Sequence, residues 1–255
     1  DPKIAIPIVL FAGLFWSFGP YVVRHIDQPE IIPWQYLFTR GIVIFFLLNV
    51  YLFLEEGLGF YKNYLKIGAS GILGGIGLGI AMITFIWSIT NTTAAVTLLC
   101  LAAMPFITAF LGFLFLNERI SLTVWIAIFV ATLGIIIMAI GNTQENTLPG
   151  LIFGLVSALG FSIFSVSLRW RVETPKFTTV AIAGLFCFIF SSVMISINEM
   201  NFLSTGKNEA LFATHGTLVC VGLILYSIGS KNIPAADLTL LSLTEVIGGI
   251  FWVWL

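Results

Sequence analysis

Two charged residues stand inside long apolar stretches of this 255-residue chain. Arg40 lies in the apolar run 34–54 and Glu245 in the run 235–255. A charge at the centre of a membrane-spanning helix costs roughly 2.5–3.5 kcal/mol unless it faces a cavity or a partner. We therefore expect a site near the middle of the membrane, where Arg40 pairs with a substrate carboxylate or with Glu245, and Glu245 pairs with a substrate amine or carries a coupled proton. The alternative is an ion pair that only fixes the register of two helices.

Less polar residues beside these charges are further candidates. His215 lies one turn into the run 211–228, where it either donates to a ligand or forms an ordinary hydrogen bond near a helix end. Aromatic residues make up 15% of the chain, so most must pack in the core or face lipid, but those beside polar residues can wall a cavity. The predicted substrate-binding residues are Glu245, Arg40, Trp16, Ser17, Tyr36, Trp87, Asn91, Phe161, His215, Tyr226 and Ser242.

Asp237 is a different kind of acidic residue. It follows Pro234 in the first turn of a predicted helix. A carboxylate in that position is favoured by the helix dipole and can reach water. We therefore expect it to stabilise the helix and to take no part in the site.

Signatures of enzymes are nearly absent. The two histidines, His25 and His215, are too far apart for a HExxH zinc site, and the glycine-rich segment 74–79 follows no strand, which favours helix packing over a phosphate-binding loop. Glu245 has no acidic companion at comparable depth, as an intramembrane enzyme would need. The three cysteines lie inside separate apolar runs, typical of small buried side chains. We expect no catalytic residues, cofactor, metal or disulfide, and a protein that is not an enzyme.

The composition indicates an all-α integral membrane protein. Hydrophobic residues make up 59% of the chain and charged residues 9%, and the mean hydropathy is +1.07. Soluble domains have about 45–50% apolar and about 25% charged residues. The net charge of −1 gives no field for nucleic acid, so the lipid bilayer and a small-molecule substrate are the expected partners. Nine apolar runs are long enough to span it: 4–23, 34–54, 67–89, 93–116, 122–140, 148–168, 177–197, 211–228 and 235–255.

The second part of the chain repeats the first. Ala235-Ala236 aligns with Ala94-Ala95, and Glu245-Val246 with Met104-Pro105; likewise Phe161 aligns with Trp16. The expected halves are residues 1–141 with five spans and 148–255 with four, so that a tenth helix is missing from a truncated or incompletely ordered C-terminus. An odd number of spans in a repeat gives two halves of opposite orientation, as in many transporters.

The loop charges predict the orientation. With a cytoplasmic N-terminus and alternating spans, two basic residues, Arg24 and Lys207, face outwards. The positive-inside rule favours this arrangement, because the basic residues on the cytoplasmic side are Lys3, Lys62, Lys66, Arg119, Arg169, Arg171, Lys176 and Lys231.

Together these features resemble the EamA family of the drug/metabolite transporter superfamily. The resemblance rests on the repeat, Met104-Pro105 after the Ala-Ala run, the ending Leu116-Asn117-Glu118-Arg119, and Trp16 with Pro20. It implies a ten-helix bundle of two inverted five-helix repeats that gives alternating access to a central cavity. Arg40 matches an arginine common in the second span of the family, and Glu245 matches the acid of a Glu-Pro position whose proline is Val246 here.

The resulting prediction is a secondary transporter in a bacterial inner membrane, with its N-terminus in the cytoplasm. The expected solute is a small metabolite, foremost an amino acid or derivative, with proton coupling as an option and bends at Pro105 and Gly248-Gly249. A passive facilitator or channel and a structural membrane subunit are the alternatives. A homodimer is possible through the face formed by Gly71, Gly75 and Gly79 or through the fifth span.

Overall fold

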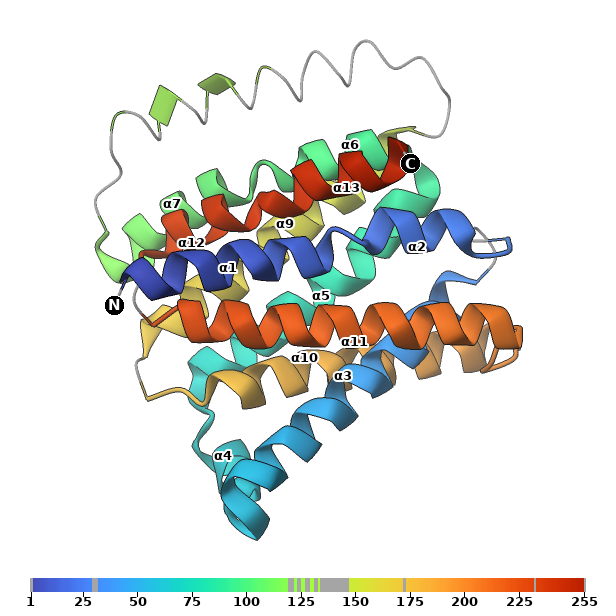
Figure 1. Ribbon diagram of the computed structural model, residues 1–255, viewed down its shortest axis with the longest axis horizontal. Helices are drawn as coiled ribbons and strands as arrows, with labels where there is room; N and C mark the ends of the chain where they lie inside the picture. The colour runs from blue at the N-terminus through green and yellow to red at the C-terminus, as the bar shows by residue number, and fades with distance from the viewer. Residues whose placement is uncertain are drawn as a thin grey trace.

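A bundle of long helices runs along the longest axis of the molecule in the computed structural model (Figure 1). The structure describes residues 2–28, 32–118, 147–171, 173–231 and 233–254, and six positions between 122 and 133. The helices of these residues are α1 (Pro2–Trp16), α2 (Gly19–His25), α3 (Pro33–Glu56), η1 (Gly57–Phe60), α4 (Tyr61–Lys66), α5 (Gly68–Asn91), α6 (Ala94–Leu101), α7 (Met104–Leu116), α9 (Thr147–Trp170), α10 (Lys176–Ile197), α11 (Gly206–Gly229), α12 (Ala235–Ser242) and α13 (Thr244–Trp254).

Seven helical stretches in the described part of the chain are long and apolar enough to cross a membrane. This confirms a multi-pass, all-α membrane protein. The predicted fifth span, 122–140, lies outside the described residues apart from isolated positions. The predicted ninth run is not among the seven, because the chain there forms two shorter helices, α12 and α13. The seven stretches are Lys3–His25, Pro33–Lys66, Gly68–Asn91, Ala94–Leu116, Leu148–Trp170, Lys176–Ile197 and Gly206–Gly229.

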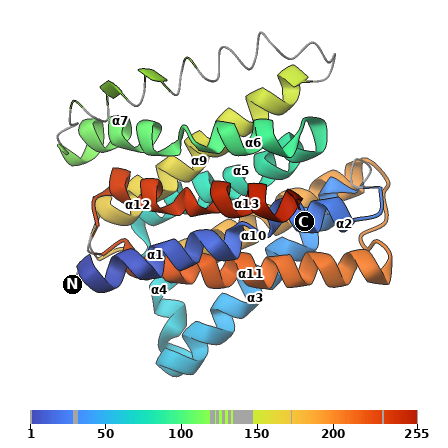
Figure 2. The ribbon, with the colours of Figure 1, turned by 45° about the horizontal axis from the view of Figure 1, so that its top comes forward.

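The contacts between helices recur when the corresponding helices of the two parts of the chain are interchanged. Helix α5 packs on α9 as α1 packs on α11, and α10 contacts α5 as α3 contacts α11. The pair α6 and α7 runs antiparallel to the pair α12 and α13 (Figure 2). These relations support two inverted halves, and the division into 1–141 and 148–255 remains a proposal.

Two helices are interrupted at matching positions. Both α6 and α12 are eight residues long. The helical conformation is interrupted after them, at Ala102-Ala103 and at Leu243. In the first break, Pro105 lies in the first turn of α7, where its missing N–H costs nothing. The prediction of a bend at Gly248-Gly249 is wrong, because both glycines lie inside α13.

The second break has no proline, and a threonine hydroxyl lies beside it. Thr244 Oγ1 donates to the carbonyl oxygens of Leu241, at 3.2 Å, and of Leu10 in α1, at 3.1 Å. Gly13 makes this approach possible, since a Cβ atom there would lie 1.9 Å from Thr244 Oγ1. Gly248 instead leaves room for Ser17, which lies 2.6 Å from the place of its Cβ atom. Its smallness serves packing and not bending.

Glycines set the closest contacts between helices. Cβ atoms on Gly75 and Gly79 would meet atoms of α10 at 2.6 and 2.5 Å, which confirms that this face of α5 is a packing face. Since α10 of the same chain covers it, the face is not available to a second copy. Gly41 of α3 and Gly184 of α10 also meet directly: a Cβ on Gly41 would lie 2.9 Å from the Gly184 carbonyl oxygen.

Candidate functional site

A central cavity lies among helices α1, α3, α5, α6, α7, α9, α11 and α13. Its volume is about 70 Å3. That is room for roughly five water molecules. Among the described residues that line it, Arg40 and Glu245 carry the charges, Ser157 and His215 add polar groups, and the rest are apolar or aromatic.

Arg40 is held in the wall of this cavity by only part of its guanidinium group. The residue is 2% exposed, Nη2 donates to the Met82 carbonyl oxygen at 2.8 Å, and the group lies 5.4 Å from the centre of the Tyr36 ring. Its buried Nε has no hydrogen-bond partner among the described residues. A buried donor without an acceptor is costly. Arg40 therefore keeps one donor that no described residue satisfies.

Glu245 faces the same cavity from the second half of the chain. It is half-buried in the first turn of α13, directly after the break at Leu243. The helix dipole favours a carboxylate there. Within the described residues, no ion pair of 4.0 Å or less joins Glu245 to Arg40. The two opposite charges thus share one cavity without neutralising each other by contact.

His215 is positioned by a tyrosine. The Tyr36 hydroxyl and His215 Nδ1 form a buried hydrogen bond, and Tyr36 packs on Phe212 with ring centres 4.8 Å apart. The other edge of the imidazole lies near Gly19, where a Cβ atom would be 3.4 Å from Nε2. The ring is thus hydrogen-bonded and also lines the cavity, and its donation to a ligand stays a prediction.

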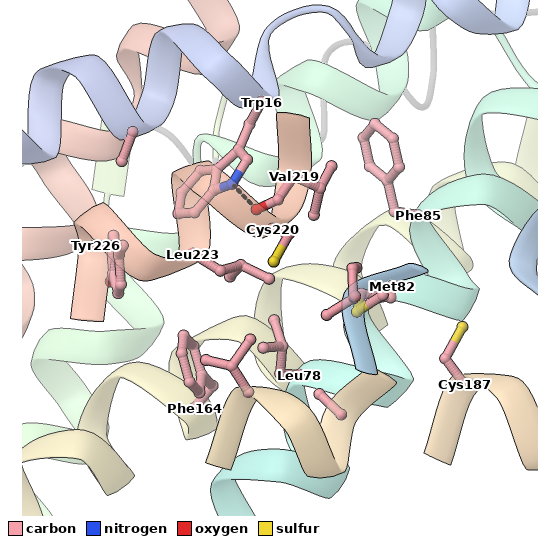
Figure 3. Close-up of a cluster of buried hydrophobic side chains, with 14 of the residues drawn as sticks. Trp16, Leu78, Met82, Phe85, Phe164, Cys187, Val219, Cys220, Leu223 and Tyr226 are labelled. Atoms are coloured by element: carbon pink, nitrogen blue, oxygen red, sulfur yellow. Dashed lines mark hydrogen bonds between the residues drawn. The ribbon is translucent and has the colours of Figure 1, made fainter. Parts of the chain in front are cut away.

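Aromatic rings form one wall. Trp16 Nε1 donates to the Val219 carbonyl oxygen at 3.3 Å, which fixes the indole between α1 and α11 (Figure 3). Its ring centre lies 5.4 Å from that of Phe161, in edge-to-face geometry, and 5.3 Å from that of Tyr226. Trp16 and Phe161 line the cavity, whereas Tyr226 lies behind them and shares a hydrogen bond of 2.6 Å with Ser165. Such a wall suits an apolar or cationic part of a solute.

Six predicted residues do not line this cavity: Tyr36 and Tyr226, whose contacts are given above, and four more. Ser17 donates to the Leu14 carbonyl oxygen and accepts from Trp252, and Ser242 donates to the Thr239 carbonyl oxygen. Ser242 therefore bonds within its own helix, whereas Ser17 also ties the end of α1 to α13. The other two pack near the end of α5: Trp87 lies against Trp34 and Phe153, and Asn91 donates to the Trp87 carbonyl oxygen.

One polar lining residue was missed from the sequence. Ser157 lines the cavity and donates to the Ala81 carbonyl oxygen at 2.9 Å, which ties α9 to α5. It lies four residues before Phe161, one helical turn away. Because residues four apart share a helix face, Phe161 could have pointed to it.

Comparison with known proteins decides the family. The sequence model described as the EamA-like transporter family matches residues 3–140, more than half of the chain. The chain belongs to the EamA-like transporter family. This EamA-like protein is also 23% identical to an "Uncharacterized transporter" of Helicobacter pylori (strain J99 / ATCC 700824), over 97% of this chain and 84% of that protein. A solved crystal structure matches its fold with a TM-score of 0.73 and 17% identity, over 98% of this chain and 88% of the other.

These comparisons agree with the helical architecture. The EamA-like protein is a multi-pass membrane transporter, and the two charges in its apolar runs lie on one cavity at the centre of the bundle.

Proposed function

We propose that this EamA-like transporter moves an amino acid, or a derivative that keeps both charges, across a bacterial inner membrane. The observation that carries the proposal is the pair of unneutralised opposite charges, Arg40 and Glu245, on one apolar cavity. A guanidinium group binds a carboxylate through paired N–H donors. A carboxylate at the opposite side binds an ammonium group.

The aromatic wall supplies the third contact. Trp16 and Phe161 offer ring surface to the solute's side chain, while Arg40 and Glu245 orient its backbone charges. Apolar walls with a few placed polar groups are typical of small-molecule sites. An aliphatic or aromatic amino acid fits this arrangement better than a nucleoside, which lacks the paired charges.

Alternating access is the proposed mechanism. The cavity is narrow, so a solute larger than a few water molecules needs the surrounding helices to move apart. The breaks at Ala102-Ala103 and Leu243 lie beside Met104 and Glu245 of the site and can absorb such motion. Glu245 is also the group proposed to take up a proton when no amine is bound.

The test is transport by the purified protein in proteoliposomes, with labelled amino acids, nucleosides and organic cations, with and without a pH gradient. We expect saturable amino acid flux. Glu245→Gln should lower it about thirty-fold or more, because losing one partner of a buried charge contact costs roughly 2–5 kcal/mol. The matched control is Asp237→Asn, the same change on exposed α12 surface, which should leave the flux unaltered.

Other outcomes oppose the proposal. Flux of nucleosides or cations alone would contradict the substrate class. Flux that does not saturate would indicate a passive facilitator. Amino acid flux that is indifferent to Glu245→Gln would give Glu245 a structural role.

A further inference from the structure

A second, larger pocket lies at the end of the bundle where α1 begins. Its lining residues come from the end of α3, from α4, from the start of α10 with the loop before it, and from the end of α11. These helices can be followed in Figure 1. Its volume is about 230 Å3, against about 70 Å3 for the central cavity. The two cavities share none of their described lining residues. This end pocket is therefore separate from the proposed transport site.

Lysines give the end pocket its charge. Lys176 and Lys231 both line it, and both also line a neighbouring pocket together with Arg169. Arg169 is paired with Glu118 at 3.2 Å, but neither lysine has a carboxylate partner among the described residues. Within the described part of the chain, Lys176 Nζ donates to Ser230 Oγ, at 2.7 Å. Two ammonium groups on one pocket repel each other, and an anion bound there would relieve this repulsion.

Two buried hydroxyls line the same pocket without a partner. Thr178 is 0% and Ser227 1% exposed, and the hydroxyl oxygens of both lack a hydrogen bond in the described part of the chain. Thr178 also belongs to the first turn of α10, whose free N–H groups and dipole favour an anion. Buried polar groups are otherwise almost always hydrogen-bonded. The unpartnered hydroxyls thus indicate a ligand with several acceptor atoms.

We propose that the end pocket binds a phosphate group. Two ammonium groups, two hydroxyl donors and a helix N-terminus surround one space, which matches a tetrahedral anion with several acceptor oxygens. The remaining charged side chain of the lining, Glu56, is engaged by Asn63 Nδ2 at 2.8 Å and leaves the lysines in excess. The phosphate can belong to a lipid headgroup or to a free ion.

The neighbouring helix favours the lipid source. Leu58 and Leu65 are 77% and 81% exposed, and Lys62 and Lys66 are exposed beside them in or next to α4. Short helices with apolar and basic faces lie in the headgroup region of a membrane. Anionic headgroups would be concentrated at the mouth of the pocket.

The test uses the full chain in nanodiscs of phosphatidylcholine with or without phosphatidic acid, and native mass spectrometry of the lipid retained. Lys231→Gln should weaken phosphatidic acid binding about five-fold, the effect of one lysine near a membrane surface. Thr178→Val should weaken it as well, because it keeps the shape and removes a donor. Lys207→Gln is the matched control, the same change at an exposed lysine that does not line the pocket.

A second arm measures the thermal stabilisation of the detergent-solubilised protein by inorganic phosphate. Stabilisation that is lost in Lys231→Gln and Thr178→Val, without selective lipid retention, supports the site with free phosphate as its ligand. Binding of neither probe overturns the proposal. So does an equal loss in Lys207→Gln, or full binding in Thr178→Val, since either result would reduce the effect to general surface charge. Transport is not read out, so this outcome is independent of the proposed function.

Discussion

At the scale of single residues, the charges of the site come one from each part of the chain. Arg40 precedes Gly41, and Ala183 precedes Gly184, which contacts Gly41. The apolar Ala183 thus stands where the arginine would recur. Glu245 in turn aligns with Met104. Because each charge occurs once, the cavity is polar at two different points and can orient a solute with two unlike ends.

Arg40→Lys tests how the arginine recognises a solute. Lysine keeps the charge but loses the planar fork, and losing one charge-assisted hydrogen bond costs roughly 1.5–3 kcal/mol. We expect the KM of a transported amino acid to rise about ten-fold or more. The KM of its methyl ester, which has no carboxylate, should stay unaltered. An equal rise for both solutes would show that Arg40 acts by supporting the helices.

At the scale of elements, the apolar runs were predictable and the breaks only in part. Hydropathy alone places seven of the nine predicted runs on spanning helices, because the lipid phase demands long apolar segments. Pro105 marks the break before α7, since proline removes a donor. The break at Leu243 was missed because no proline marks it, and Thr244 beside it contacts Leu10 of α1, which is far away in sequence.

The charged residues of the site could be predicted from the sequence, and most of its neutral contacts could not. Arg40 and Glu245 could be found because a charge in lipid is expensive. Asn91 and Trp87 were chosen only for their neighbours in sequence, and the structure uses them at the end of α5. The Met82 carbonyl oxygen that holds Arg40 carries no sequence signal at all.

Gly41→Ala tests the contact between α3 and α10. Inside a helix, alanine is normally preferred over glycine by about 1 kcal/mol. Here the new Cβ would lie 2.7 Å from the Phe188 backbone nitrogen, which cannot turn away. We expect destabilisation of about 1–3 kcal/mol, measured as a lower midpoint of thermal unfolding in detergent.

Gly206→Ala is the control for this change. A Cβ atom on Gly206 has no neighbour within 4 Å, so its effect should stay within about 0.5 kcal/mol. Equal midpoints for the two variants would mean that α3 and α10 can move apart without loss.

At the scale of the whole molecule, charge is divided unequally between the two ends. Lys176, Lys231 and the Arg169–Glu118 pair gather at the end where α1 begins. The other end holds the exposed pair of Lys207 and Asp27, at 2.8 Å. This asymmetry supports the proposed cytoplasmic N-terminus.

Cysteine labelling tests this orientation. Lys207→Cys should react with a membrane-impermeant maleimide in intact spheroplasts, whereas Lys62→Cys should react only after permeabilisation, with about ten-fold or greater contrast. The native cysteines, Cys100, Cys187 and Cys220, are buried and give little background. The reverse pattern would place the N-terminus outside.

The contact between Trp16 and Phe161 has a consequence for how such a cavity can change. These residues align with each other in the two parts of the chain, and they also touch. In a dimer of identical subunits a residue of this kind meets its own copy, so that one mutation alters both sides of the contact at once. In a single chain each side mutates alone. A large ring at one of the two positions can face a smaller side chain at the other. The shape of the cavity can therefore change on one side alone, and with it the solutes that fit.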